Sequence, residues 1–283
     1  MWLRDLLPRD LPDARVLSFE YDSQWLRDPN IVTLEDCGNR LLESILWDRT
    51  HQGSQSMCPI MARRPIILLG HSYGGLVIKQ AMVTAAKAVR DDPKYEYYQA
   101  FLASIVGVQF LGTPHNGSTF AEAGILQARV NVAFGGAANA ELLRPLVVGS
   151  TLKILHELHA AFRYYLENLD HLSGLSSTYF YETKKMKLGP LETKIVVDKN
   201  SACYGSRAPS EEVPLEANHK ELNKFESRYE SNYKRVVGCL AHVHKRAKDL
   251  VEARLGSNEP SFLSLNTLAD LNRVPIQQLR PWG

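Results

Sequence analysis

The sequence predicts an α/β protein whose mostly parallel sheet is covered by helices on both faces, and two stretches carry this prediction. An apolar run at residues 65–69 (PIILL) leads through a glycine turn into a helical pattern from Ser72 to about Val89. A second run, residues 105–111 (IVGVQFL), is apolar over almost its whole length, which is typical of a central parallel strand buried on both faces. Strands that alternate with helices in this way favour a parallel sheet.

The elements before the first of these strands are expected to be short. Residues 1–13 show a brief helical pattern that prolines end, and residues 14–21 (ARVLSFEY) predict a strand. A helix is expected from Thr33 to about Trp47, because Thr33 is a suitable N-cap with Asp36 three residues later.

Residues 119–176 interrupt the alternation with helical patterns near 119–134, 138–148 and 150–169. An all-helical insert at this point predicts a cap over a site at the sheet edge. A plain connection that packs on the sheet fits the same pattern, so both interpretations stay open.

The alternation then resumes. Residues 178–181 (TYFY) and 194–197 (KIVV) predict strands, residues 212–215 a short extended piece, and residues 225–255 a long helix. We therefore expect one α/β domain over residues 1–255, with a helical cap at about 119–176. Residues 256–283 are expected to be a tail or a linker.

The composition excludes several functional classes. The 283 residues carry a formal net charge of +2, without the dense basic stripe that nucleic-acid binding needs. Four cysteines are scattered and form no C-x-x-C pair, which argues against a zinc site or a disulfide framework. His242 and His244 lie two apart on a helical pattern, so their rings face different sides and chelate a metal poorly.

The chain shows no apolar stretch long enough to span a membrane and no secretory signal, so we expect a soluble intracellular protein without a transmembrane segment. The oligomeric state cannot be predicted from the sequence.

The turn after the first strand, Gly70-His71-Ser72-Tyr73-Gly74, matches the pattern G-x-S-x-G. Between a buried strand and an amphipathic helix, this pattern predicts a strained turn that exposes the serine hydroxyl as a nucleophile. Gly70 and Gly74 are expected where side chains would clash as strand and helix approach each other. An ordinary tight turn is the alternative interpretation.

A serine nucleophile needs a base and an orienting carboxylate, which follow it along the chain in the order acid, then histidine. Of the nine histidines, His219 alone lies in a loop after the last strand-like segment, whereas His71 lies within the turn and points away. Glu182 follows one predicted strand and Asp198 follows the next, and the pattern alone leaves these two acids open.

Five segments in this order resemble the α/β-hydrolase domain of the serine-active-site-containing (SERAC-type) proteins. They are equally similar to the hydrolase domains at the front of fungal NACHT and ankyrin-repeat proteins, and to the wider lipase-like DUF676 group with its similarity to GPI inositol-deacylases. The segments are GHSYGGLVIKQA, GVQFLGTPHNGS, FYET, VVDKNSA and ANHKELNKF, and the resemblance extends over about residues 1–250.

The resemblance implies an α/β-hydrolase fold and a choice between the two acids. In related lipases a V-P-x-x-S-A segment follows the acid, and Asp198 stands where its proline would be, so the resemblance favours Glu182 with Asp198 in reserve. It also implies an N-terminal strand whose H-G-x-x-G-like turn supplies one oxyanion-hole amide, the other being that of Tyr73. The chain starts at the W-L-R-D-L-L-P segment that follows this strand, so the strand is expected to be missing.

Two functions follow as hypotheses. The first is a serine esterase or lipase that acts on an ester or acyl lipid through Ser72, His219 and Glu182, with no metal or organic cofactor. The second is a non-catalytic interaction or signalling module, inactive because one oxyanion donor is absent. The resemblance further implies mitochondrial, endoplasmic-reticulum or peripheral membrane association.

Overall fold

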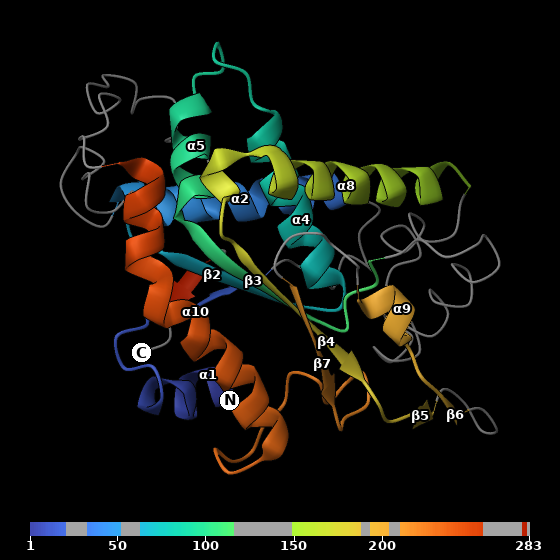
Figure 1. The fold of residues 1–283 in the computed structure, drawn as a ribbon. Helices are drawn as coiled ribbons and strands as arrows, with labels where there is room; N and C mark the ends of the chain where they lie inside the picture. Colours follow the sequence, from blue (N-terminus) through green and yellow to red (C-terminus); the bar gives the residue numbers. More distant parts are fainter. Residues whose placement is uncertain are drawn as a thin grey trace.

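Four parallel strands form the main sheet of the protein (Figure 1). The structure, a computed structural model, describes residues 1–20, 33–51, 63–115, 149–187, 193–203, 210–256 and 279–281. The sheet has the order β2-β3-β4-β7, with all neighbouring strands parallel. Its strands are β2 (Ile66–His71), β3 (Ile105–Leu111), β4 (Ser176–Glu182) and β7 (Ser210–Leu215). This arrangement confirms the predicted α/β class.

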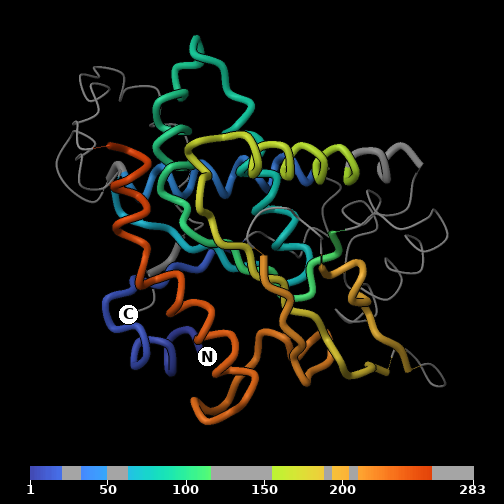
Figure 2. The backbone as a smooth tube through the Cα atoms, in the orientation of Figure 1, coloured from blue at the N-terminus to red at the C-terminus, as the bar shows by residue number. Residues whose placement is uncertain are grey.

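Helices cover the two faces of the sheet, as the ribbon and the tube both show (Figures 1 and 2). One face carries α4 (Tyr73–Lys87), which packs against the other helices of that layer, and the opposite face carries α10 (Ser231–Leu255). The helices that contact α4 are α2 (Leu34–His51), α5 (Tyr95–Ser104) and α8 (Gly149–Asn168).

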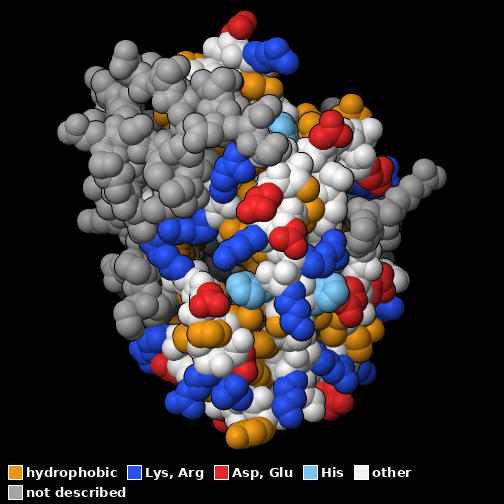
Figure 3. Space-filling view, turned by 60° about the vertical axis from the view of Figure 1, so that its left-hand side comes forward, with side chains coloured by type: hydrophobic (Ala, Val, Ile, Leu, Met, Phe, Trp, Pro, Cys, Tyr) orange, Lys and Arg blue, Asp and Glu red, His pale blue; other side chains and the backbone are white. Residues whose placement is uncertain are grey.

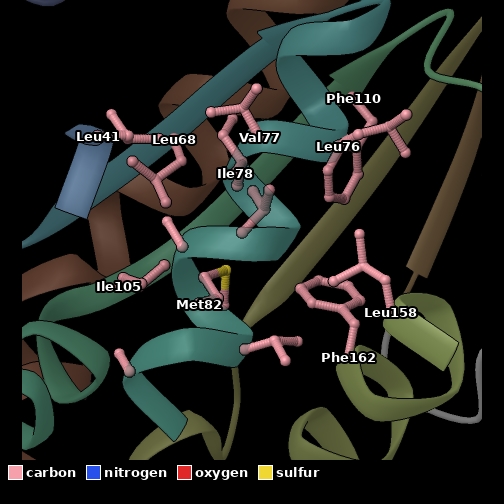
Figure 4. Close-up of a cluster of buried hydrophobic side chains, with 14 of the residues drawn as sticks. Leu41, Leu68, Leu76, Val77, Ile78, Met82, Ile105, Phe110, Leu158 and Phe162 are labelled. Carbon is pink, nitrogen blue, oxygen red and sulfur yellow. The ribbon is translucent and has the colours of Figure 1, made fainter. Parts of the chain in front are cut away.

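Successive strand residues supply two separate cores because side chains alternate across a sheet. Phe110 and Tyr179 stack on the α4 side, where α4 and α8 enclose them, whereas Leu111 and Phe180 lie in the core under α10. Figure 4 shows Phe110 on the same side as Leu76 of α4 and Phe162 of α8. Burial on both faces explains why β3 is apolar along almost its whole length.

Several predicted boundaries are confirmed. The strand expected at residues 105–111 is β3 with those bounds. The helix expected from Thr33 is α2, and Thr33 caps it: its hydroxyl accepts the Asp36 N–H at 3.1 Å, and the Asp36 carboxylate accepts the Thr33 N–H at 2.8 Å. The N-terminal helical pattern forms α1 (Trp2–Asp5) and the short 3₁₀ helix η1 (Leu7–Arg9), and Trp2 packs edge-on against Phe225.

The strand predicted at residues 194–197 is wrong. Lys194 belongs to β6 (Thr193–Lys194), which pairs antiparallel with β5 (Met186–Lys187) outside the main sheet. Residues 195–198 form no strand, and the next element is the short helix α9 (Lys199–Ala202). The amides of this apolar segment serve the site described below instead of a strand ladder.

Three further expectations have partial outcomes. The strand expected at residues 14–21 is β1 (Leu17–Phe19), which pairs with β8 (Leu279–Pro281), a strand that the sequence did not predict. The rest of the expected tail, residues 257–278 and 282–283, lies outside the described residues. So do the first two helices of the expected cap; the third is α8, and the 3₁₀ helix η4 (Asp170–Leu172) follows it.

The long helix α10 is amphipathic. Its buried residues, Tyr233 to Val251 at helical spacing, face the sheet, while Lys234, Lys245 and Arg246 are exposed. Figure 3, which brings this side forward, shows Lys and Arg side chains interspersed with Asp and Glu. Among the described helices, none has the length and apolar character that crossing a membrane requires.

Replacing Gln109 with methionine is expected to raise the free energy of unfolding by about 1–3 kcal/mol, since a buried amide without hydrogen bonds is costly. Gln109 lies in the middle of β3 and is 1% exposed, and neither atom of its amide has a hydrogen-bond partner in the described part of the chain. Urea unfolding measures the change. Gln80→Met is the control: the Gln80 amide donates to Thr84 Oγ1 at 3.3 Å, so this substitution should not stabilise the protein. A destabilised Gln109→Met variant would contradict the prediction.

Candidate active site

The functional residues predicted from the sequence meet at one edge of the main sheet. All four strands are parallel, so their carboxyl ends lie together at that edge. Ser72 follows β2 directly, Glu182 is the last residue of β4, and His219 comes four residues after the end of β7. Three segments that are far apart in the sequence thus contribute to one site.

Ser72 occupies a strained turn between β2 and α4. Its backbone has φ 53° and ψ −124°, and it is the one non-glycine residue of the described chain with positive φ. The turn is held from both sides: Ser72 N–H donates to the carbonyl of Leu111 at 2.8 Å, and Gly75 N–H donates to the carbonyl of Ser72 at 3.1 Å. A conformation of this kind costs about 1–3 kcal/mol and is characteristic of functional sites.

Close packing around this turn requires two glycines, but one of them is not the glycine that the sequence predicted. A Cβ on Gly70 would lie 2.7 Å from the backbone nitrogen of Gly75, as expected. A Cβ on Gly74 would meet no atom of the described residues within 4 Å, so the expectation of a clash there is wrong. The close approach occurs at Gly75, where a Cβ would lie 2.0 Å from Thr113 Oγ1. The reason is that the first turn of α4 presents Gly75, not Gly74, to the loop after β3.

Ser72, His219 and Glu182 form one continuous chain of hydrogen bonds. His219 Nε2 lies 2.9 Å from Ser72 Oγ, and His219 Nδ1 lies 2.7 Å from Glu182 Oε2. The three residues are 1%, 0% and 3% exposed, so water competes little for these contacts. Because the carboxylate can only accept, Nδ1 carries the proton and Nε2 is left to accept from the serine hydroxyl.

The other carboxylate oxygen of Glu182 is also satisfied. Oε1 accepts the backbone N–H of Val196, in a short contact, and that of Val197 at 3.1 Å. Residues 196 and 197 belong to the segment that the sequence assigned to a strand, and its amides bind this buried carboxylate instead. The three N–H donors satisfy the charge of Glu182 and hold its side chain toward His219.

Asp198, the reserve acid, has a different role in the structure. It is the N-cap of α9, where its Oδ1 accepts the Ser201 N–H at 3.0 Å. None of the described hydrogen bonds joins Asp198 to His219.

The backbone around His219 is shaped to accept the imidazole. Gly112, at the end of β3, has φ 57°, and a Cβ there would lie 3.1 Å from two atoms of the His219 ring. Asn218 organises the turn: its side chain accepts the Lys220 N–H at 3.1 Å, and its carbonyl accepts the Glu221 N–H at 2.9 Å. Glycine at position 112 therefore meets both a conformational and a steric requirement.

Sequence reasoning missed one residue of this site. His71 was expected to point away, but its Nε2 lies 2.8 Å from the backbone carbonyl of His219, and the two rings have centroids 5.1 Å apart. Its place at the carboxyl end of β2, beside the nucleophile, is the signal that could have identified it.

The arrangement can generate a nucleophile. The imidazole can accept the serine proton while the carboxylate stabilises the resulting imidazolium. Tyr73 begins α4 directly after Ser72, so its amide lies at the positive end of the helix dipole, where a developing oxyanion is stabilised. Within the described ranges, no group of three or more His, Cys, Asp or Glu side chains is placed to hold a metal ion.

Comparison with known proteins finds distant similarity to Protein SERAC1 from three vertebrates. The chain is 27% identical to the Danio rerio protein over 240 residues, which cover 83% of this chain and 32% of that protein. It is 25% identical to the Mus musculus protein over 248 residues (87% and 33%) and 25% identical to the Bos taurus protein over 252 residues (88% and 34%). The chain thus spans about a third of the length of these relatives. No family model matches the chain, and no solved structure does. The similarity to SERAC1 covers the segments that contain Ser72, Glu182 and His219.

Proposed function

We propose that this chain is a serine hydrolase that cleaves carboxylic esters, with Ser72 as the nucleophile, His219 as the base and Glu182 as the orienting carboxylate. The observation that supports it most is the hydrogen-bonded chain from Ser72 Oγ through His219 to Glu182, with contacts of 2.9 and 2.7 Å. The strained backbone of Ser72 supports the same proposal, because a stable fold retains such strain where function requires it.

The proposed reaction has two halves. His219 Nε2 takes the hydroxyl proton as Ser72 Oγ attacks the ester carbonyl, and the Tyr73 N–H stabilises the oxyanion. The imidazolium then protonates the leaving alcohol, and an acyl-Ser72 ester remains. In the second half, water attacks this ester as it loses a proton to His219, and the imidazolium returns that proton to Ser72 Oγ as the carboxylic acid leaves, which restores Ser72 and His219.

The substrate class is proposed to be an ester or acyl lipid, and residues 1–255 are proposed to form the hydrolase domain. The resemblance to lipase-like domains supports the acyl substrate. Association with an organelle membrane, mitochondrial or of the endoplasmic reticulum, is a further part of the proposal and rests on the resemblance to the SERAC-type group alone.

The Ser72→Ala variant tests the proposal. Wild-type protein is expected to react covalently with a fluorophosphonate probe and to hydrolyse p-nitrophenyl butyrate, whereas Ser72→Ala should lose both activities, because the variant lacks the hydroxyl that His219 Nε2 contacts. Ser177→Ala is the matched control: Ser177 is a buried serine of β4 in the same sheet, 1% exposed, and its hydroxyl makes no hydrogen bond in the described chain. Equal labelling of wild type and Ser72→Ala would refute the proposal.

A non-catalytic module is the competing function, and one observation favours it. In the described part of the chain β2 pairs with β3 alone, so the strand that carries the nucleophile lies at the edge of the described sheet. A second oxyanion donor from a strand beside β2 is absent from the described site, and losing one such donor costs about 10²–10³ in rate. Ester turnover that depends on Ser72 would exclude this alternative.

A further inference from the structure

We propose that His71 is a positioning residue, which fixes the main chain of the base His219 relative to the nucleophile and contributes to turnover through it. This inference rests on the proposed function. The contact that carries it is between the His71 side chain and the His219 backbone, and it lies beside the proton-transfer chain without belonging to it.

The contact defines the tautomer of His71. A backbone carbonyl only accepts hydrogen bonds, so the His71 Nε2 that lies 2.8 Å from the His219 carbonyl must carry the proton. The rings of the two residues also pack together, with centroids 5.1 Å apart and planes 38° from parallel. The His71 side chain therefore touches both the main chain and the ring of the base.

Two consecutive residues hold the same histidine. Ser72 contacts the His219 ring through Oγ at 2.9 Å, and His71 contacts the His219 carbonyl at 2.8 Å. Glu182 supplies a third contact at Nδ1. A ring held at two atoms can still swing if its main chain shifts, and the bond from His71 opposes that shift. Because His71 and Ser72 are adjacent at the end of β2, the nucleophile and the support of its base move as one unit.

His71 supplies this bond without adding charge. Burial, first of all, and then the nearby basic groups of His219 and Lys224 together lower the pKa of His71 to about 3, although the hydrogen bond to the His219 carbonyl acts in the opposite direction. The imidazole of His71 is thus neutral at working pH. A charged donor at this position would oppose the imidazolium that His219 must become during the reaction.

The His71→Phe and His71→Gln variants separate positioning from packing. Phenylalanine keeps a ring beside His219 but has no donor, whereas glutamine keeps a neutral N–H donor of similar reach. With p-nitrophenyl butyrate as substrate, we expect His71→Phe to lower kcat by about 10–100-fold with little change in KM, the size of effect that a small displacement of a reacting group produces. His71→Gln should recover most of this loss.

Two readouts distinguish positioning from a loss of folding. The kcat lost in His71→Phe should be recovered in His71→Gln, because glutamine restores a donor to the His219 carbonyl. The low-field proton signal of His219 Nδ1–H should broaden in His71→Phe and return in His71→Gln. Neither change is expected from a fold that is merely less stable.

The outcomes also separate this inference from the proposed function. A folded His71→Phe with wild-type kcat would overturn the role of His71, and so would a His71→Gln variant as impaired as His71→Phe. A wild-type protein that shows no labelling dependent on Ser72 would instead overturn the proposed function. In that case the Nδ1–H signal would still report whether His71 orders His219.

Discussion

Replacing Glu182 with glutamine is expected to lower kcat by about four orders of magnitude, with little change in the folded structure. The wild-type carboxylate accepts from two backbone amides through Oε1 and from His219 Nδ1 through Oε2. A glutamine has one oxygen and one NH₂ group to place in the same positions. The two backbone N–H donors of Val196 and Val197 select the oxygen, so the NH₂ group must face His219.

This arrangement reverses the tautomer of the base. The glutamine N–H donates to His219 Nδ1, so the ring proton moves to Nε2, and Nε2 can no longer accept from Ser72 Oγ. The nucleophile then has no base although every heavy atom is near its original position. The measurement is kcat with p-nitrophenyl butyrate, together with the rate of fluorophosphonate labelling.

Asp198→Asn is the matched control because Asp198 is the other acid that the sequence favours. Asparagine is as good an N-cap as aspartate, so its amide oxygen can still accept the Ser201 N–H and hold α9. Wild-type activity is expected, within about twofold. A loss with Asp198→Asn comparable to that with Glu182→Gln would show that the acid has been assigned to the wrong residue.

The parts of the site that could be predicted from sequence are those that depend on local pattern. The run at residues 105–111 has an end fixed by Gly112, and it forms β3 with the predicted bounds. The glycine-serine-glycine turn after β2 identifies Ser72, and the parallel order of strands places Glu182 and His219 at the same edge as Ser72. These placements can be predicted because turn chemistry and side-chain alternation act over a few residues, whereas the catalytic roles of the three residues stay proposals.

The parts that could not be predicted depend on which distant group satisfies a backbone atom. Residues 195–197 are apolar and β-branched, as a buried strand would be, but the N–H groups of Val196 and Val197 are bound by a carboxylate fourteen and fifteen residues away. The contact of His71 with the His219 carbonyl is of the same kind. Sequence pattern gives the secondary structure to which a residue belongs, but not the partner of a particular polar group.

A buried lysine illustrates the same limit and carries the second large prediction. Lys79 of α4 is 1% exposed, and its Nζ lies 2.8 Å from His159 Nδ1 and 5.1 Å from the centre of the Phe162 ring. His115 lies in the same cluster and is 2% exposed, and neither of its ring nitrogens has a partner in the described chain. Burial lowers the pKa of all three basic groups well below their usual values.

The charged neighbours that act on these pKa values are all basic. Lys79 and His159 lower the pKa of His115, and the pKa of His159 is lowered by Lys79, Arg163 and His156. The folded protein therefore keeps all three groups neutral, whereas the unfolded chain protonates Lys79 below pH ~10.4 and the histidines below pH ~6.5. Because the unfolded state then binds more protons, stability falls as the pH falls through these values. The loss is about 1.4 kcal/mol per pH unit for Lys79 alone and about 4 kcal/mol per unit below pH ~6.5, where all three groups contribute.

Lys79→Met is accordingly expected to stabilise the protein by about 2–4 kcal/mol at pH 7. The gain is the removed cost of holding a neutral amine, about 5 kcal/mol for a lysine whose usual pKa lies about three to four units above pH 7, less about 1–3 kcal/mol for the hydrogen bond lost by His159. Urea unfolding at pH 6, 7, 8 and 9 measures the stability of both proteins.

The pH dependence of this difference is the decisive feature, because better packing by methionine would add a constant amount at every pH. The difference between Lys79→Met and wild type should shrink as the pH rises toward 10, where the unfolded lysine also becomes neutral. Lys87→Met, at an exposed lysine of the same helix, is the control and should show no such slope. A difference that stays constant from pH 6 to 9 would mean that Lys79 is charged in the folded protein. In that case the whole cluster would have to tolerate a buried cation beside two imidazoles.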